Sequence, residues 1–448
     1  MVINFIKYFA CFALVLMTAA VNAQGIENSP YSKFGIGDQV DKSFTSSRNM
    51  GSLRSVYTDP YSINIYNPAT LPYIYASSFE VGGYGKYAIQ KDNTKDDAVF
   101  GGNLDYLSIA FPLSNPINDA YEGKSKADKW GMNISLVRNS NVGYNISSLD
   151  QIEDLGSVQR NYSGTGGTYN FLFGTGYRYK DFSVGLNVGY LFGNLKYSRT
   201  INFIDLSFPY NNDFNENYFL SGFTMRGGLM YNLTLNKTQI KANKNADVKR
   251  LTIGVSGTPG TKFSTIKDRF ELVRQSLGTS TRVDTINLQR DLEGSGKLPG
   301  EFNFGLFYSN GEKFGAGIDV GIGSWSNYYN EANYENINSL KNTTSVSFGG
   351  FYRPDYKSYT SFWKRVQYQY GVYYRQDPRV INGTQIENYG VTFGLGLPVV
   401  FQRKFSNASL GFDIGKLGSN TPISETYIKL NFGFSFNDDE WFIKRKYN

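Results

Sequence analysis

The chain has 448 residues, with 48 Gly, 35 Tyr and 34 Phe, but its hydrophobic content is only 40%. It contains no His and a single Cys, and its formal net charge is +7. Because the chain has no His, Ser-His triads and His-based metal sites are excluded. The positive charge is modest and spread along the chain, so it does not form the basic patch of a nucleic-acid-binding surface. We therefore predict no enzyme, no cofactor, no metal site and no nucleic-acid partner.

The N-terminus has the pattern of a secretory signal peptide. Lys7 provides a short positive region, residues 8–20 form an apolar run, and residues 21–23 (VNA) offer a small-residue cleavage site. The run is too short to span a bilayer as a helix. We predict that residues 1–23 are a signal peptide. Its removal would take away Cys11 and leave a mature chain with no disulfide and no thiol nucleophile.

Residues 24–76 follow the signal and show no regular period. They end in SINIYNPATLPYI, Ser62 to Ile74, which is rich in Asn, Pro and Tyr. Pro68 fixes its own φ and moves Asn67 away from helical geometry. A disordered leader, a surface strap or a plug would each fit this position, and the low charge with many Tyr and Ile argues against disorder. We predict a hatch or plug.

From residue 77 onward, apolar and polar side chains alternate with the period of a β-strand. The alternate positions on the apolar side, here called the apolar parity, carry large aromatic residues. The positions between them, the other parity, are mostly Gly, Ser, Asn and Thr. Such segments are near the ~9–11 residues that a tilted strand needs to cross a bilayer. Fourteen segments are predicted: 77–90, 103–113, 129–138, 168–180, 181–192, 218–232, 249–257, 300–310, 312–323, 343–353, 366–376, 387–400, 407–416 and 424–436.

The links between these segments alternate between short and long, as expected for an outer-membrane barrel. Lys180-Asp181 and Asn310-Gly311 are predicted to be tight turns. The long links are 139–167, 193–217, 258–299 and 324–342, and we predict them to be outer loops. Links 114–128, 233–248 and 354–365 fit less well, because periplasmic turns are usually short.

The fold class predicted is all-β: a closed transmembrane antiparallel β-barrel of about 14 strands with an N-terminal plug in its lumen. The domains are a signal peptide (1–23), a plug (24–76), a barrel (77–436) and a periplasmic C-terminal tail (437–448). A soluble β-sandwich would also alternate, but a lipid exterior around a wet lumen explains the large aromatics on one parity better. Closure is required because hydrocarbon offers no partner to an open sheet edge.

One stretch of the long link 258–299 has helical spacing. KFSTIKDRFELVRQSL, Lys262 to Leu277, is predicted to form a loop helix that ends at Gly278. Its apolar face would either begin a ligand groove or pack on the barrel rim. That face consists of Phe263, Ile266, Phe270, Val273 and Leu277.

Two further patterns concern the barrel wall. The small-residue parity is rich in Gly, including the pairs Gly185 and Gly189, and Gly394 and Gly396, which leaves space for a ligand or a plug or allows strand bending. The tail carries Trp441 and Phe442 beside Lys444, Arg445 and Lys446, which suits a periplasmic interface with outer-membrane lipid. A docking tail for a partner is the alternative.

Several stretches resemble the FadL-type outer-membrane transporters of long-chain fatty acids and other hydrophobic compounds. The family's hatch motif is similar to Asn67-Pro68-Ala69, with Met50-Gly51 upstream. KLPGEFNFGLFYSNGEKFGAGIDVGIGSWSNY and TPISETYIKLNFGFSF resemble its later strands, and the tail DDEWFIKRKYN looks like the ending of Bacteroidota relatives. The large outer link 258–299 departs from the family pattern.

The resemblance implies a fourteen-stranded barrel in the cell outer membrane for passive, hatch-gated uptake of a fatty-acid-like hydrophobic small molecule. It implies a hatch role for Asn67, Pro68 and Ala69. The alternative is a non-transport barrel that serves as a subunit of an outer-membrane secretion or assembly complex, with other outer-membrane proteins as partners. The two functions share a fold, but a transporter should have a continuous apolar cavity from the outer loops to the hatch, whereas a subunit should have a filled lumen and a large exposed apolar patch on its loops or wall.

Overall fold

The computed structural model describes residues 28–92, 95–113, 128–243, 246–277, 280–335, 337–401, 404–438 and 440. The predicted signal peptide and the aromatic and basic tail from Trp441 to Lys446 lie outside the described residues. Within the described ranges, no helix combines the length and the apolar character needed to cross a membrane.

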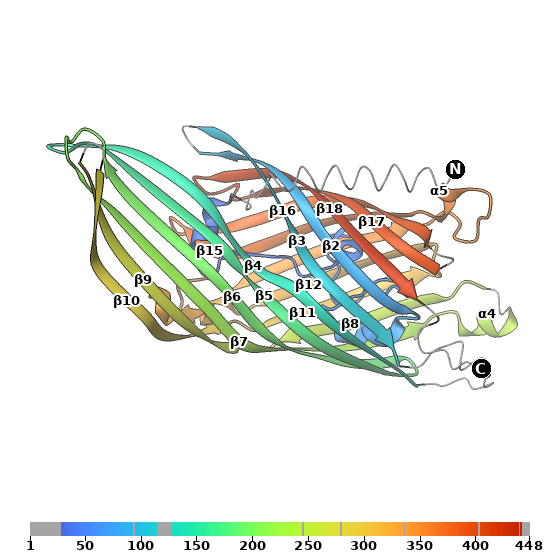
Figure 1. The fold of residues 1–448 in the computed structure, drawn as a ribbon. Coiled ribbons are helices and arrows are strands. Elements are labelled where there is room, and N and C mark those ends of the chain that lie inside the picture. Colours follow the sequence, from blue (N-terminus) through green and yellow to red (C-terminus); the bar gives the residue numbers. More distant parts are fainter. Residues whose placement is uncertain are drawn as a thin grey trace.

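Fourteen antiparallel strands close into a barrel (Figure 1). The last strand pairs with the first from Ser424/Lys91 to Asp438/Ser77, so the wall has no open edge there. The closed-barrel prediction is confirmed. The strands are β2 (Ser77–Lys91), β3 (Asp96–Pro112), β4 (Asp128–Ile152), β5 (Gly156–Tyr179), β6 (Phe182–Phe203), β7 (Tyr210–Thr234), β8 (Lys249–Thr258), β11 (Glu301–Asn310), β12 (Phe314–Gly323), β14 (Thr343–Tyr352), β15 (Gln367–Ile381), β16 (Thr384–Phe401), β17 (Lys404–Leu417) and β18 (Ser424–Asp438).

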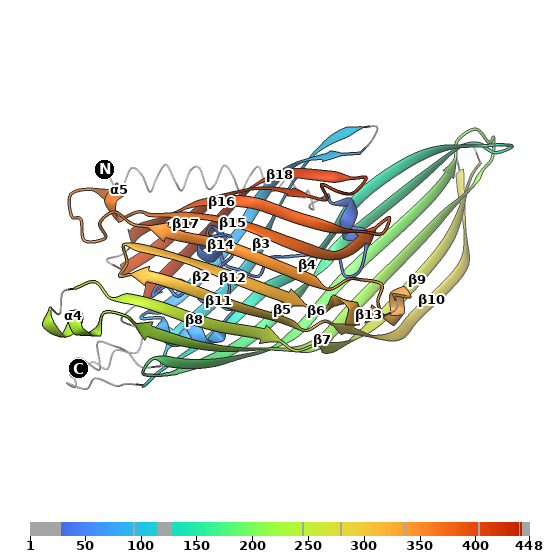
Figure 2. The ribbon, with the colours of Figure 1, turned by 180° about the vertical axis from the view of Figure 1, so that it is seen from behind.

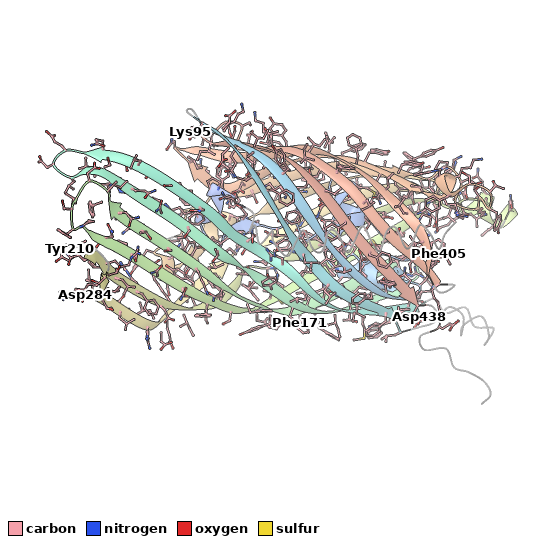
Figure 3. The ribbon with its side chains drawn as sticks, turned by 45° about the horizontal axis from the view of Figure 1, so that its top comes forward. Lys95, Phe171, Tyr210, Asp284, Phe405 and Asp438 are labelled. Carbon is pink, nitrogen blue, oxygen red and sulfur yellow. The ribbon has the colours of Figure 1, made fainter. Side chains whose placement is uncertain are left out.

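Side chains in the wall alternate between a lipid-facing exterior and a buried interior. In β6, Phe182 and Leu186 are 48% and 46% exposed, whereas Ser183 and Asn187 are fully buried. Figure 3 marks Phe171 on the same outer surface of the wall. This distribution is typical of a barrel in a bilayer with a polar interior.

Four wall strands continue beyond the wall and, together with two further strands, form what we call the outer extension. It consists of residues 139–152 of β4, 156–170 of β5, 190–203 of β6 and 210–222 of β7, with β9 (Thr261–Leu277) and β10 (Ser280–Leu298). Figure 2 shows these strands rising well past the ends of β11 to β18. The prediction that 139–167, 193–217 and 258–299 are loops is therefore wrong. Polar residues occur on both faces of these segments beside the apolar ones, so their strand period is not visible as a regular apolar alternation.

The helix predicted over Lys262–Leu277 is also wrong, since this segment is strand β9. It pairs with the outer half of β7 from Tyr210/Gln275 to Gly222/Phe263, and with β10 along its length. These ladder bonds on both sides outweigh the helical spacing of the apolar residues, as tertiary context overrides local pattern. The inner half of β7 pairs instead with β8.

The remaining elements are short. On the side of the tight turns lie α4 (Lys237–Ala242) and α5 (Phe362–Arg365). The predicted turn at Lys180-Asp181 is present between β5 and β6, and the turn after Asn310 runs through residues 311–313. The link 324–342 holds η3 (Trp325–Asn327), β13 (Tyr329–Asn330) and η4 (Glu331–Asn333), and the N-terminal segment holds η1 (Pro30–Lys33), β1 (Asp38–Gln39), α2 (Thr45–Arg48) and η2 (Pro68–Tyr73).

Candidate functional site

The N-terminal segment from residue 28 to residue 76 lies in the bore of the barrel. Its helix η2 packs against β4, β5, β6 and β7, and α2 packs against β16, β17 and β18, so the segment contacts opposite sides of the wall. Most of its residues between 43 and 76 are buried, with Met50, Leu53, Ala69 and Leu71 at 0% exposure. This segment, hereafter the plug, fills the lumen as the sequence predicted.

The Asn-Pro-Ala motif organises the inner part of the plug. Asn67 is fully buried, and its Oδ1 accepts a hydrogen bond from the backbone N–H of Ala69 at 3.0 Å, which caps η2. Its Nδ2 donates to the carbonyl oxygen of Ser55 at 2.6 Å. Pro68 occupies the first helical position, where its fixed φ suits the helix start and no N–H is needed. The motif thus joins two parts of the plug.

Glycines of the wall allow the plug backbone to approach closely. A Cβ at Gly185 of β6 would lie 2.3 Å from the carbonyl carbon of Pro68. A Cβ at Gly371 of β15 would lie 2.2 Å from the backbone nitrogen of Gly51. These positions have room only for hydrogen. The space that the Gly-rich parity provides at these positions is therefore taken by the plug and not left open.

Met50 and Gly51 anchor the opposite side of the plug. Gly51 has φ +68°, and its N–H donates to Oγ1 of Thr392 at 3.0 Å. The same hydroxyl donates to the carbonyl oxygen of Asn49 at 2.8 Å. Asn49 donates through Nδ2 to Oε1 of Gln369 at 2.9 Å. The plug is therefore hydrogen-bonded to strands β15 and β16.

Buried ion pairs add to these contacts. Nη1 of Arg48 lies 2.6 Å from Oδ2 of Asp105 in β3, and both side chains are nearly inaccessible to solvent. Asp41 lies 2.8 Å from Nη2 of Arg375 in β15 and 3.6 Å from Nη2 of Arg54. Removing one partner of such a pair leaves an uncompensated buried charge and costs about 3–5 kcal/mol. These pairs therefore hold the plug in one arrangement.

A further polar cluster joins the plug to β2 and β3. Glu80 of β2 accepts from the backbone N–H of Ile63 at 2.8 Å and from the Ser62 hydroxyl at 3.2 Å. Tyr106 of β3 stacks on Phe44 with ring centroids 3.7 Å apart. We did not single out Glu80 or Asp105 from the sequence. Their positions in the alternation could have identified them, because each is a carboxylate at a position where most neighbours along the strand are Gly, Ser or Asn.

The wall has a seam on its outer side between β3 and β4. These strands pair only from Tyr106/Val137 to Pro112/Gly131, and beyond that point they no longer pair with each other. The start of the plug covers the seam. Asp38 and Gln39 pair with Asn141 and Ser140 of β4, and Ser29 donates its backbone N–H to Gly143.

The start of the plug, residues 28–40, is hereafter called the leader. The outer link 324–342 binds the leader on the side away from β4. Gly35 donates its backbone N–H to Oε1 of Glu335 at 2.9 Å, and the Tyr328 hydroxyl donates to Oε2 at 2.8 Å. Burial raises the pKa of Glu335, and these hydrogen bonds offset part of that rise. The leader is thus clamped between β4 and this loop.

Three cavities lie between the plug and the wall, with volumes of about 150, 110 and 60 Å³. Small-molecule sites generally have roughly 300–1,000 Å³ and a mostly apolar lining. The two larger cavities are lined by charged side chains, including Asp41, Arg375 and Asp377. None of the three is an apolar passage of acyl-chain size. In the part of the chain that the structure describes, no group of three or more acidic side chains is arranged for a metal ion.

The residues predicted for an outer apolar groove do not share one face. Phe263 is buried toward the lumen, whereas Ile266 lies on the opposite face of β9 and is 43% exposed. Phe270 and Val273 likewise alternate between the two faces of the strand. The side chain of Leu277 lies outside the described residues. The strand period therefore separates what a helix would have brought together.

Comparisons with known proteins identify both the fold and the family. The toluene transporter TodX of Pseudomonas putida shares 15% identity, with 90% of this chain and 99% of that chain covered and a TM-score of 0.52. A FadL homologue of Pseudomonas aeruginosa shares 12% identity, with coverages of 90% and 99% and a TM-score of 0.54. The toluene transporter TbuX of Ralstonia pickettii shares 12% identity, with coverages of 88% and 98% and a TM-score of 0.52.

At these identities the likeness shows a shared 14-strand barrel fold and nothing about the ligand. No curated protein matches the chain. A family model described as BamG matches residues 5–448, which is nearly the whole sequence. The chain therefore belongs to the BamG family.

Proposed function

We propose that this protein is a non-transport subunit of the outer-membrane BAM assembly complex, held in the outer membrane by its barrel. The family name supports this role, because the match to BamG extends over residues 5–448. The structural observation that carries the proposal is the filled lumen. The plug is packed against wall glycines and paired through Arg48–Asp105 and Asp41–Arg375.

Passive uptake of a hydrophobic small molecule, the other function predicted from the sequence, requires an apolar route through the bore. The three cavities described above have volumes of about 150, 110 and 60 Å³, and charged groups line the larger two. Opening a route would break buried ion pairs that cost about 3–5 kcal/mol each when one partner is left alone. The plug of this chain therefore favours a structural role, in which Asn67, Pro68 and Ala69 fix its fold.

A disulfide that locks the plug to the wall separates the two functions. Ser55 of the plug and Ser256 of β8 have hydroxyl oxygens 3.5 Å apart, so S55C/S256C is placed for a crosslink. The matched control is S78C/S435C, which joins β2 to β18 in the wall, where the hydroxyls are 3.0 Å apart. The control crosslink forms no covalent link to the plug, although S435C removes the hydrogen bond from the Ser435 hydroxyl to the carbonyl oxygen of Tyr61.

The readout is the level of other barrel proteins in the outer membrane of cells whose only copy is the variant. We expect the oxidised S55C/S256C protein to support the same level as S78C/S435C and to co-purify with other BAM proteins in mild detergent. If the locked plug abolishes function while the wall control does not, or if the purified protein carries acyl ligand and no partner, the subunit role is wrong.

A further inference from the structure

Strand β10 is the margin of the outer extension, and one of its edges is open. Its ladder with β9 runs from Ser280/Leu277 to Leu298/Thr261. On the other side, only Gly296 and Lys297 pair with a strand, the two-residue β13. Among the described residues, 281–289 have no backbone partner on that side. Figures 1 and 2 both place β10 at the outer margin of the sheet, beyond β9.

The side chains on both faces of the open stretch are also exposed. Of residues 281–289, all but Asn287 are exposed, and Val283, Ile286 and Leu288 are 52%, 66% and 49% exposed. Val283 and Leu288 pair with Arg274 and Phe270 of β9, so they lie on the face that carries Ile266. This face of the edge therefore presents two exposed apolar side chains beside Thr281 and Thr285, and nothing in the described chain covers it.

Natural edge strands are usually protected by Lys, Pro, bulges or a covering loop. Residues 281–289 contain neither Lys nor Pro, and their protection consists of the exposed charges of Arg282 and Asp284 and the register shift between Thr285 and Asn287. At the opposite margin of the extension, the leader binds β4 at Gly143 and Asn145, next to residues 146–152, which pair only with β5. No described segment pairs with the open side of β10 between residues 281 and 289.

A row of unpaired backbone N–H and C=O groups selects an extended strand as its ligand, because only another strand continues the ladder. The net charge of the edge restricts which strands can bind to it. Arg282 and Asp284 lie 3.0 Å apart and neutralise each other, so the stretch 281–289 carries no net charge. A strand of low net charge fits this edge without burying an unpaired charge.

A second copy of this chain does not fit the same edge. Barrel strands tilt by roughly 35–45° from the membrane normal. Two copies in one membrane are related by an axis along that normal, so their facing β10 strands point outward in the same sense and cross at about 70–90°. That crossing is incompatible with a ladder, in which neighbouring strands differ by roughly 20–25°. The occupant must come from a different protein.

We propose that residues 281–289 of β10 bind an extended strand of another protein by β-augmentation outside the membrane. The strand has low net charge and places apolar side chains beside Val283 and Leu288. The inference rests on the proposed function in taking that protein to be another subunit of the assembly complex. The edge itself is defined by this chain's backbone alone.

Site-specific photocrosslinking in intact cells tests the contact. A photoreactive residue replaces Val283 or Leu288, and the matched control position is Lys196, an exposed residue of β6 that is paired to β5 and β7 on both sides. We expect both β10 positions to crosslink to one extended segment of a single protein at least about tenfold more than position 196. Equal crosslinking at all three positions, or crosslinks only to a second copy of this chain, would overturn the proposal.

A backbone variant tests the ladder. Ile286 falls in the register shift and has no Cα partner on β9, so I286P disturbs the β9–β10 ladder less than a proline at a paired position would and hinders a further strand from pairing with β10. The matched control I286T keeps the N–H and changes only the side chain. We expect I286P to lose the partner at least about tenfold and I286T to retain it, with both proteins equally folded by heat-modifiable gel migration.

The outcomes distinguish this inference from the proposed function. If the BAM proteins co-purify with I286P at the wild-type level, the edge inference fails and the subunit role stands. If Val283 and Leu288 crosslink to a surface strand of a protein outside the assembly complex, the edge inference stands and the subunit role fails.

Discussion

The plugged wall and the outer extension share strands β4 to β7, yet they differ in what lies against these strands. Strand β6 contributes Gly185 to the wall, where the plug backbone of Pro68 leaves no room for a Cβ. In the outer extension the same strand carries Lys196 with its side chain exposed. In the wall, lipid and plug cover the two faces. In the extension, residues of β10 are exposed on both faces.

This difference shows where each region obtains its stability. The wall depends on close packing and buried polar contacts with the plug, because every inward group must find a partner away from bulk water. The extension combines its backbone ladders with an apolar cluster on its inner face that includes Leu195, Tyr218 and Phe263, and its outermost edge and faces remain available for contacts with other proteins. Substitutions in the wall should therefore cost most, and the predictions below follow that order.

The largest effect is expected where the plug meets a wall glycine. G185L would place a side chain against the plug backbone, since even a Cβ would lie 2.3 Å from the carbonyl carbon of Pro68. Because neither backbone can move aside, we expect the plug to leave the bore or the barrel to fail to fold, at a cost of several kcal/mol. Limited proteolysis of residues 28–76 in the outer-membrane fraction measures this.

The matched control for this substitution is G227L in the neighbouring strand β7. A Cβ at Gly227 meets nothing within 4 Å. We expect G227L to keep the plug protected. Equal protection in G185L and G227L would show that the plug does not press on β6, and the contrast between the two regions would then lose its main support.

The next largest effect is expected from breaking a buried ion pair. R48A leaves Asp105 buried without its partner at 2.6 Å and should lower the free energy of unfolding by about 3–5 kcal/mol. The control is K91A, which removes an ion pair of similar distance, 2.8 Å to Asp96, whose side chains are more than half exposed. That change should cost less than about 1 kcal/mol.

Denaturant midpoints of the folded barrel in detergent measure both variants. The double variant R48M/D105L should recover part of the lost free energy, because no charge is then left unpaired. If R48A and K91A have the same midpoint, the plug is held by packing alone.

The wall of the barrel was predictable from the sequence, whereas the extension was not. From Phe182 to Phe192, apolar and small or polar residues alternate because lipid lies on one side and the lumen on the other. The strand period can therefore be seen in the residue types. In Tyr210–Tyr218 polar residues occur on both faces of the strand, and the residues Tyr-Asn-Asn-Asp-Phe-Asn-Glu-Asn-Tyr show no continuous run of apolar residues at alternate positions. For Lys262–Leu277, the misleading helical spacing had no lipid-facing alternation to contradict it.

The site was predictable only in part. Asn67 and Pro68 are local signals, since a cap and a helix start depend on neighbouring residues. The partners that fix the plug are far apart in the chain: Arg48 meets Asp105, and Asp41 meets Arg375. A single sequence does not contain these pairings, because they depend on the rotation of the plug within the closed wall.

A smaller effect is expected from the cap of η2. N67A removes the acceptor for the Ala69 N–H and the donor to the Ser55 carbonyl oxygen, and should cost about 1 kcal/mol or somewhat more. N67S keeps a short side-chain acceptor for the cap and loses only the amide donor. We expect hydrogen exchange at Ala69 to rise most in N67A and less in N67S.

A result in which N67S exchanges as fast as N67A would show that the bond to Ser55, and not the cap, holds the motif. Unchanged exchange in both variants would remove Asn67 from the contacts that organise the plug, and would leave the wall glycines and ion pairs as its remaining supports.

The smallest effect is expected at the junction of the two regions, where Glu335 binds the leader at Gly35. Burial raises the pKa of Glu335 above its ordinary value of 4.5, so the folded protein disfavours the charged form. The stability that this group contributes is therefore fully present below pH 4.5 and is lost as pH rises through the folded-state pKa. We expect the protection factor of the Gly35 N–H to fall across that window in the wild type. In E335Q it should stay flat, because the amide oxygen still accepts from Gly35 and no charge forms. A wild-type protection factor that rises with pH would mean that the hydrogen bonds from Tyr328 and Gly35 to the carboxylate outweigh burial, and the leader would then be clamped most firmly by the charged form.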